Sequence, residues 1–393
     1  MRYFVLLVMS LLIVGGVRSQ NSEIIDIISH INEDSIRKNV EDLENFTTRF
    51  AFADNNRDVA LYLKDRMEYY GFEVVLDSFY ESNSPVWRDS LYFDGWQYNV
   101  CCLKQSLNPL YYDTSLILGA HYDCISNIDG FDDYIHFAPG ADDNASGVAC
   151  LLELARVWDK YSKRQDINLR IEFFANEEQM LSGSNARLHS ISSPWQMYLV
   201  GMIHLDMVGY DTTNTVALNY YNGCDWLTDI AKQNITANTD MTYRLTQKSI
   251  ENSDSWCFYS WGIPSLFISE SDFSPYYHTL QDSSVYLNYT YMKKITSLTL
   301  SMVYYIVNNI SKVSLNKLKA QDCLIYVNKN KVFVDLYTSL YSRVRITDIL
   351  GNVVFYEEYD SPSFMIPIDN LNEGFYILEL VTPYYRTSKK IRR

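Results

Sequence analysis

The chain has 393 residues, of which 47% are hydrophobic and 21% charged, and its formal net charge at pH 7 is −15. This length suits one large catalytic domain and a smaller second one, and the composition is that of a folded protein. The acidity argues against nucleic acid as the main partner, because binding phosphates requires a basic face.

The N-terminus has the pattern of a targeting segment. Met1-Arg2 supplies a positive start, and residues 3–17 are almost wholly apolar. Val17 and Ser19 are small residues at the two positions that a signal peptidase reads, so we expect a signal peptide over residues 1–19 and an exported protein. The alternative, a membrane anchor, is disfavoured because the apolar core is short for a span, and we expect no membrane span elsewhere.

Helices and strands alternate along most of the mature chain. We expect helices at 24–31, 35–46, 54–70, 148–163, 223–234 and 289–309. We expect strands at 72–79, 96–103, 115–120, 169–175, 197–205, 215–219 and 265–269. This order predicts an α/β domain of three layers, in which a mixed, largely parallel sheet lies between helices.

Polar side chains that could bind a metal follow several of these strands or lie in loops. The candidates are His121, Asp123, Asp143, Glu177, Glu178, Asp206 and His278. Because sites in α/β proteins form at the carboxyl ends of strands, we expect these side chains to converge. Singly, each has a structural alternative: an Asp-rich turn before a helix, a solvated acidic turn, a cap, or a histidine in a turn. Together, nitrogen and oxygen ligands from separate elements suit zinc or a similar divalent ion.

Two pairs of neighbouring residues indicate a division of roles. His121 and Asp123 are two residues apart on a strand and share a face, so Asp123 is placed to accept the second ring proton of a metal-bound His121. Glu177 and Glu178 are adjacent and point in opposite directions, so we expect one to bind metal and the other to act as a general base. One shared carboxylate, with one histidine and one carboxylate for each ion, gives a hydrolytic site with two ions about 3.5–4 Å apart.

Five separated motifs in this order resemble the di-zinc aminopeptidases, which are secreted exopeptidases with a zinc-peptidase α/β fold. The motifs are Gly119-Ala-His121-Tyr-Asp123, Pro139-Gly-Ala-Asp142-Asp143-Asn-Ala-Ser-Gly147, Glu177-Glu178 with Gly183-Ser184, His204-Leu-Asp206-Met and Tyr277-His278-Thr. The resemblance runs from about Ile24 to Asn309 and includes Thr48-Arg49 and Gly262-Ile-Pro264.

The resemblance implies a role for each candidate. Asp143 would bridge two zinc ions, other divalent metals also being possible. His121 and Asp206 would hold one ion, and Glu178 and His278 the other. Glu177 would be the base that activates a metal-bridging water, Asp123 would support a bound histidine, and the Asp143–Asn144 peptide bond would be cis.

The chain departs from the family pattern at two places. Glu178 is followed by Gln179-Met-Leu-Ser instead of the usual Gly-Leu-x-Gly, and the usual Ser-Asp-His is Ser253-Asp254-Ser255 here. These departures leave the side-chain preference open. The five expected metal ligands are all present.

The pattern changes after residue 309. Residues 314–322 form a polar linker between a peptidase domain at 20–313 and a C-terminal domain at 323–393. We expect short strands at 324–327, 331–336, 342–348, 353–359, 364–368 and 374–381, which together predict a small β-sandwich. One alternative for such a sandwich is a substrate-binding module.

Three C-terminal segments resemble the sorting domain of type nine secretion. They begin at Val344, Ile368 and Ser388 and read VRITDILGNVV, IDNLNEGFYIL and SKKIRR. This resemblance implies export through the periplasm, with the type nine machinery as a partner, and release from the cell or attachment to its surface.

We therefore expect a secreted zinc aminopeptidase that removes N-terminal residues from peptide substrates. Glu177 would move the proton of the attacking water, and Tyr277 would donate a hydrogen bond to the developing oxyanion. Two alternatives remain open. One is a related di-zinc carboxypeptidase or a glutaminyl cyclase-like enzyme. The other is a non-catalytic surface-binding protein on a peptidase scaffold.

Overall fold

The computed structural model describes residues 22–86, 91–106, 108, 114–127, 134–191, 198–248, 250–309, 323–328, 330–336, 342–361, 363–381 and 386–393. The predicted signal peptide and the predicted linker at 314–322 lie outside these residues. The chain forms two compact units, one built mainly from the residues up to Asn308 and the other mainly from Asn309–Arg393. Each is described below by itself.

The larger unit is built on one mixed, mostly parallel sheet in the strand order β1-β2-β4-β3-β5-β8-β6-β7. The strands are β1 (Glu73–Pro85), β2 (Tyr92–Lys104), β3 (Thr114–His121), β4 (Asn168–Phe174), β5 (Tyr198–Leu205), β6 (Thr215–Tyr220), β7 (Thr242–Thr246) and β8 (Ser265–Glu270). β5 runs parallel to β8, and β6 runs parallel to β7. β1, β2 and β4 form an antiparallel edge, and β6 is antiparallel to β8.

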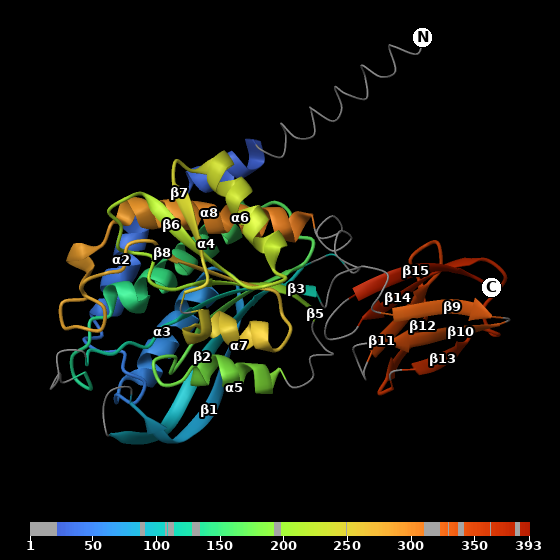
Figure 1. The fold of residues 1–393 in the computed structure, drawn as a ribbon, viewed down its shortest axis with the longest axis horizontal. Helices are drawn as coiled ribbons and strands as arrows, with labels where there is room; N and C mark the ends of the chain where they lie inside the picture. The colour runs from blue at the N-terminus through green and yellow to red at the C-terminus, as the bar shows by residue number, and fades with distance from the viewer. Residues whose placement is uncertain are drawn as a thin grey trace, which may run out of the picture. The chain divides into compact units, whose positions relative to one another are not determined.

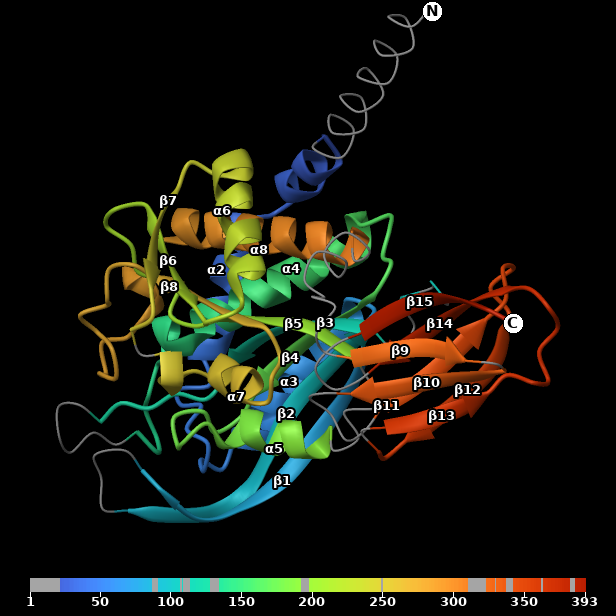
Figure 2. The ribbon, with the colours of Figure 1, turned by 45° about the vertical axis from the view of Figure 1, so that its right-hand side comes forward.

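Helices cover both faces of this sheet (Figures 1 and 2). A helix at 22–29 comes first. It is followed by α2 (Glu33–Glu44), α3 (Asn56–Tyr69), α4 (Gly147–Tyr161), α5 (Ser182–Ser190), α6 (Asp225–Asn238), α7 (Asp254–Ser260) and α8 (Tyr289–Asn308). α2, α4, α6 and α8 pack on one another on one face, while α5 and α7 pack together on the other (Figure 1). The predicted three-layer α/β fold is therefore confirmed.

The buried strands and helices follow from the sequence in simple ways. Every residue of β3 is buried, as its continuous apolar run predicts for a central strand. α2 begins at Asn32, whose side chain accepts the backbone N–H groups of Asp34 and Ser35, and it buries the stripe formed by Ile36, Val40 and Leu43. β3 and β5 lie next to each other and end at His121 and Leu205, so the polar residues that follow them emerge at the same edge.

The sequence pattern missed several elements of this unit. α5, α7 and β7 were not predicted, and β1 and β2 extend beyond the expected limits to Pro85 and Tyr92. α5 and α7 are short, with nine and seven residues, so neither presents a full amphipathic repeat. β7 has four exposed residues out of five and therefore lacks a buried face that alternation could reveal.

The smaller unit contains two antiparallel sheets, with strand orders β13-β10-β9 and β12-β11-β14-β15. The strands are β9 (Cys323–Asn328), β10 (Lys331–Leu336), β11 (Ser342–Thr347), β12 (Val353–Tyr359), β13 (Ser363–Pro367), β14 (Phe375–Val381) and β15 (Arg386–Arg392). Side chains from both sheets share one core, which includes Val332, Val334, Val344, Ile366 and Leu378. This is the predicted all-β sandwich, with β15 as an additional edge strand.

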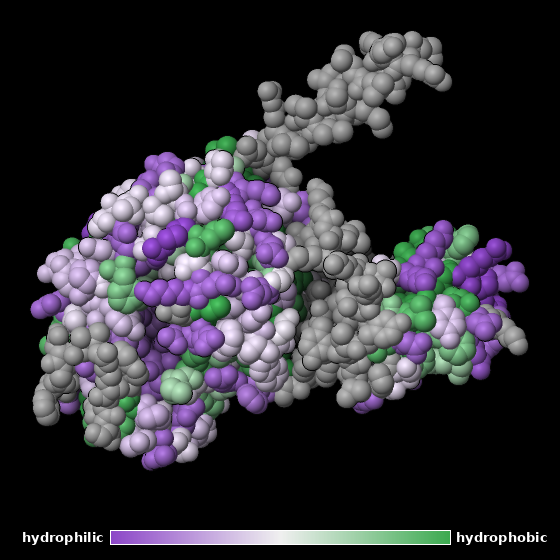
Figure 3. Space-filling model, viewed as in Figure 1, coloured by the Kyte–Doolittle hydropathy of each residue, from purple (hydrophilic) through white to green (hydrophobic). Residues whose placement is uncertain are grey.

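None of the helices in the described part of the chain is both long and apolar enough to cross a bilayer. The face of the larger unit that is visible in Figure 3 is mostly hydrophilic or neutral, with small, separate hydrophobic patches.

Candidate metal centre

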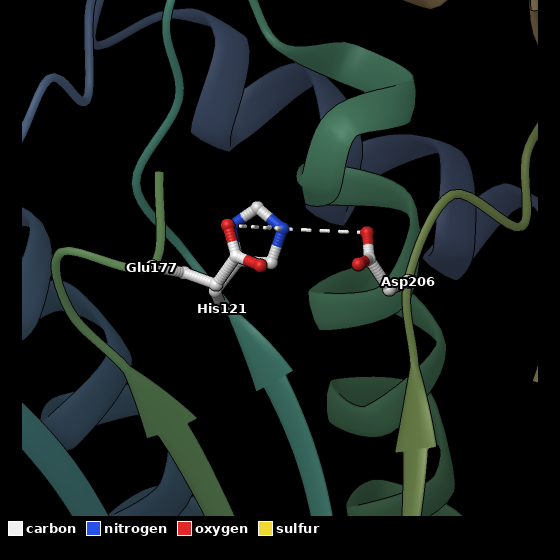
Figure 4. Close-up of side chains that lie close together, drawn as sticks. All are labelled: His121, Glu177 and Asp206. Carbon is white, nitrogen blue, oxygen red and sulfur yellow. Dashed lines mark hydrogen bonds and ion pairs between the residues drawn. The ribbon is translucent and has the colours of Figure 1, made fainter. Parts of the chain in front are cut away.

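His121, Glu177 and Asp206 form the first group of converging side chains (Figure 4). His121 ends β3, Glu177 follows β4, and Asp206 follows β5. The Nε2 atom of His121 lies 3.3 Å from Oδ1 of Asp206 and 4.0 Å from Oε2 of Glu177. All three side chains are largely buried: the exposed fraction is 1% for His121, 9% for Glu177 and 11% for Asp206.

Asp143, Glu178 and His278 form the second group. The Nε2 atom of His278 lies 2.9 Å from Oε2 of Glu178 and 3.1 Å from Oδ2 of Asp143. The other oxygen of Asp143, Oδ1, lies 3.2 Å from Nε2 of His121. The carboxylate of Asp143 therefore faces both histidines, one with each oxygen, and it joins the two groups.

The five residues predicted as metal ligands are thus brought together from five separate segments of the chain. In each of the two groups, the ligand atoms lie within 4.8 Å of one another. Glu177, the predicted base, belongs by distance to the group of His121 and Asp206. The peptide bond between Asp143 and Asn144 is cis, as the family resemblance implies.

Asp123 links the first group to the loop that carries the two glutamates. One of its carboxylate oxygens accepts the backbone N–H of Glu177 at 3.0 Å, and the other accepts that of Glu178 at 3.2 Å. The Nδ1 atom of His121 lies 3.2 Å from the backbone oxygen of Asp123 and 3.6 Å from its carboxylate. Asp123 therefore contacts both the histidine and the glutamate loop, and the closer acceptor for the imidazole is its main chain.

The pKa values of the buried acids shift in opposite directions. Burial raises the pKa of Glu177 well above its ordinary range, and it raises that of Glu178 to about 7. Burial also opposes ionisation of Asp143 and Asp206, but the neighbouring histidines outweigh it and hold both pKa values below the ordinary value. Because both glutamates shift upward, their roles are distinguished by distance and not by pKa: Glu178 lies close to a histidine nitrogen, and Glu177 lies farther from one.

The donor set fits divalent cations. Four carboxylates, from Asp143, Glu177, Glu178 and Asp206, are crowded beside two imidazoles, and within the described ranges no lysine or arginine forms an ion pair with them. Oε1 of Glu178 is buried without a hydrogen-bond partner. Burying several negative charges without compensation is costly, and bound cations would supply that compensation. Carboxylate and imidazole ligands are those that zinc accepts.

Tyr277 lies beside the second group, because its ring stacks on that of His278 with centroids 3.7 Å apart. Phe273 packs against Tyr277 in turn, in an edge-on arrangement with centroids 4.9 Å apart, and is itself 67% exposed. Burial raises the pKa of Tyr277, so its hydroxyl keeps its proton and can donate a hydrogen bond.

His204 also adjoins the site, although it was not among the candidate residues named from the sequence. It is fully buried in β5, and its Nε2 atom lies 3.9 Å from Oδ2 of Asp206 and 3.8 Å from Oδ2 of Asp254. Asp254 belongs to the Ser253-Asp254-Ser255 segment in which the chain departs from the family pattern. His204 lies near the end of β5 and Asp206 directly after it, and this two-residue spacing was the signal that could have placed them together.

Comparison with known proteins shows the family of the chain and agrees with its fold. Residues 99–303 match the model of peptidase family M28, and residues 328–392 match the model of the secretion system C-terminal sorting domain. A leucine aminopeptidase 1 from Leptosphaeria maculans is 31% identical over 209 residues, which are 49% of this chain and 52% of that protein. The chain thus spans about half the length of this relative.

Two solved structures have a similar fold. The zinc aminopeptidase BSAP from Bacillus subtilis superposes with a TM-score of 0.60 at 17% identity, covering 74% of this chain and 98% of that one. A glutaminyl cyclase from Bacteroides thetaiotaomicron superposes with a TM-score of 0.54 at 20% identity, covering 70% of this chain and 98% of that one. At these identities the likeness concerns the fold alone.

Proposed function

Because the chain belongs to peptidase family M28 and ends in a secretion sorting domain, we propose that it is a secreted zinc aminopeptidase that removes N-terminal residues from peptides. The observation that carries this proposal is the position of Asp143, whose two oxygens lie 3.2 Å and 3.1 Å from the Nε2 atoms of His121 and His278. A carboxylate in that position suits a ligand shared by two ions, and a pair of ions about 3.5–4 Å apart is a common hydrolytic centre.

In this proposal His121, Asp143 and Asp206 hold one zinc ion, while Asp143, Glu178 and His278 hold the other. Bound in this way, the ions would polarise the scissile carbonyl and lower the pKa of the attacking water. Asp123 orients the site through His121 and through the backbone of the glutamate loop.

Glu177 is the proposed general base. It takes the proton of the attacking water and passes it to the leaving amine, so the hydrolysis balances with one water consumed for each peptide bond cleaved. Tyr277, which keeps its hydroxyl proton, donates a hydrogen bond to the oxygen of the tetrahedral intermediate.

The sorting domain supports a proposal about the route of the enzyme. Residues 1–19 would direct export to the periplasm, and residues 323–393 would address the protein to the type nine secretion machinery. Residues 20–313 would form the peptidase domain, with 314–322 as the linker. The enzyme would then act outside the cell or on its surface.

A panel of substrates tests the proposed activity. Purified protein with zinc should release the first residue from free-amine peptides and should leave N-acetylated copies of the same peptides intact. Release of a C-terminal residue would indicate a carboxypeptidase, and loss of ammonia from N-terminal glutamine without cleavage would indicate a cyclase. Absence of every product from zinc-loaded protein would support the non-catalytic alternative.

A further inference from the structure

The backbone of the loop that carries Asp143 is held from one side by a buried arginine. The side chain of Arg49 is 1% exposed. Its Nη1 and Nη2 atoms donate to the backbone oxygens of Pro139 and Gly140 at 2.8 and 2.6 Å. Its Nε atom donates to the oxygen of Tyr122 at 2.8 Å. The guanidinium group therefore ties the segment that follows His121 to the loop that precedes Asp143.

The same loop is held from the other side by a buried aspartate. The carboxylate of Asp282 accepts the backbone N–H of Asp142 at 2.8 Å and that of Asp143 at 3.0 Å, one with each oxygen. Its backbone oxygen accepts the N–H of Ala141 at 3.0 Å. Asp282 lies four residues after His278 and is 3% exposed, so it ties the loop to the segment that supplies the second histidine.

Together the two side chains form hydrogen bonds with both carbonyl and amide groups of this short loop. Arg49 takes carbonyls of residues 139 and 140, and Asp282 takes amides of residues 142 and 143. The chain turns at Gly140, which has φ +52°, and a Cβ atom there would lie 2.3 Å from Cβ of Cys124 and 2.8 Å from Nη2 of Arg49. The loop can therefore approach the guanidinium group only because residue 140 is glycine.

From this arrangement we infer that Arg49 and Asp282 are positioning residues that act as a clamp on Asp143. They hold its carboxylate between the two histidines. Arg49 fixes the loop relative to the segment after His121, and Asp282 fixes it relative to the segment of His278. The inference rests on the proposed function, in which Asp143 is the ligand shared by two zinc ions. The clamp would raise zinc affinity and fix the spacing of the site without contacting metal or substrate.

Conservative substitutions test each half of the clamp. Arg49→Lys keeps the charge but cannot reach three carbonyls in a planar fork, and Asp282→Asn keeps the shape but turns an N–H donor toward one of the two amides. The zinc dissociation constants of both sites are measured by competition with a chromophoric chelator. We expect each variant to weaken zinc binding about 10–100-fold, the usual cost of losing a group that orients a metal ligand.

Matched variants control for general loss of stability. Arg156→Lys removes a guanidinium contact with the backbone oxygen of His30, and Asp348→Asn alters a carboxylate that accepts two backbone amides in the smaller unit. Both should bind zinc like the unaltered protein. Circular dichroism and thermal unfolding identify the temperature at which every variant is folded, and zinc binding is compared there.

A second readout separates positioning from simple loss of metal. At saturating zinc, the clamp variants should keep a near-normal KM but have a lower kcat, because only the position of the shared carboxylate is altered. Folded variants with unaltered zinc affinity and kcat would overturn the clamp. If Arg49→Lys alone behaves normally, the part assigned to Arg49 is wrong. If the unaltered protein binds no zinc, the proposed function fails instead.

Discussion

The backbone N–H of Glu177 donates to a carboxylate oxygen of Asp123 at 3.0 Å. The proposed base is thereby attached to the residue that also contacts the imidazole of His121, so the position of the base and that of a metal ligand depend on one side chain. Asp123 is 1% exposed, so its carboxylate interacts with these buried groups and not with solvent.

Asp123→Asn should therefore lower activity while leaving the fold intact. The amide keeps one oxygen for the backbone of the glutamate loop but presents an NH₂ group to the second backbone N–H. We expect kcat to fall about 10–100-fold, as for other residues that orient a metal site. Steady-state kinetics with a zinc-saturated sample measures this. An unchanged kcat would mean that the link between Asp123 and Glu177 does not matter for the reaction.

Glu177→Gln should separate catalysis from metal binding. The side chain keeps its size and an oxygen but can no longer accept a proton, and general bases contribute about 10²–10⁴-fold to rate. We expect that loss in kcat with unaltered zinc content, measured by kinetics and elemental analysis on the same sample. Loss of zinc in this variant would show that Glu177 and Glu178 have exchanged the roles assigned to them.

Metal content provides an independent check on the site. Elemental analysis of active protein should find two zinc ions per chain, and Asp143→Ala should lose affinity for both ions because its carboxylate faces both histidines. Asp206→Ala, by contrast, should weaken one ion more than the other, since of the two proposed ligand histidines Asp206 is grouped with His121, at 3.3 Å, and not with His278. If Asp206→Ala lost both ions to the same extent as Asp143→Ala does, Asp143 would not be the only ligand shared by the two ions.

Much of the fold and of the site was predictable from the sequence, for identifiable physical reasons. The strands β3 and β5 are apolar and end in polar residues, so His121 and Asp206 could be expected at one edge of the sheet. The approach of His278 and Asp143 was not derivable from strand patterns, because both lie in loops. Their grouping came from the order of the motifs and is consistent with the distances in the structure.

Other features lacked any local signal. Met180 and Leu181 have φ values of +70° and +58°, a conformation that residues other than glycine seldom adopt, and nothing in the local sequence indicates it. Asp282 looked like an ordinary turn residue, and its contacts with Asp142 and Asp143 span 140 and 139 positions of the chain. Long-range hydrogen bonds of this kind have no periodicity for a sequence pattern to reveal.

A buried ion pair allows a prediction about stability. Glu172 in β4 is fully buried, and both of its oxygens accept hydrogen bonds from Arg187 in α5 at 2.9 Å. Arg187→Met should destabilise the larger unit by about 3–5 kcal/mol, because it removes the arginine that donates to both oxygens of this buried carboxylate and also pairs with Asp77. Urea unfolding followed by tryptophan fluorescence reports mainly on this unit, since six of the seven tryptophans belong to segments of the larger unit.

The same pair predicts a dependence on pH. Burial opposes ionisation of Glu172, but Arg187, with a smaller contribution from Arg170, outweighs it and lowers the pKa below the ordinary value. A group with a lowered pKa in the folded state stabilises the protein above its unfolded pKa, here about 4.3, and that contribution is lost as the pH falls through the folded value. The difference between the unaltered protein and Arg187→Met should therefore be largest near pH 7 and shrink in acid.

An ion pair on the surface serves as the control for the predicted loss of stability in Arg187→Met. Lys64 and Glu68 are one helical turn apart on α3 and partly exposed, so Lys64→Met should cost only about 0.3–0.5 kcal/mol. A loss of that small size in Arg187→Met would show that the buried pair adds little to stability.

The final prediction concerns the C-terminal unit. Every proposed metal ligand precedes Asn309, and the sandwich has its own core, which includes Val332, Val344 and Leu378. A chain ended near Leu315 should therefore fold, bind zinc and cleave short peptides at close to the full-length rate. In the native host the truncated enzyme should accumulate in the periplasm, because the sorting address is gone. Kinetics of the purified truncated chain measures the first expectation, and fractionation followed by an activity assay of each compartment measures the second.

Two outcomes would contradict the sorting role. Normal zinc binding with weaker binding of longer peptides would make the sandwich a substrate-binding module. Delivery of the truncated enzyme to the surface or medium would show that the sandwich is not the address.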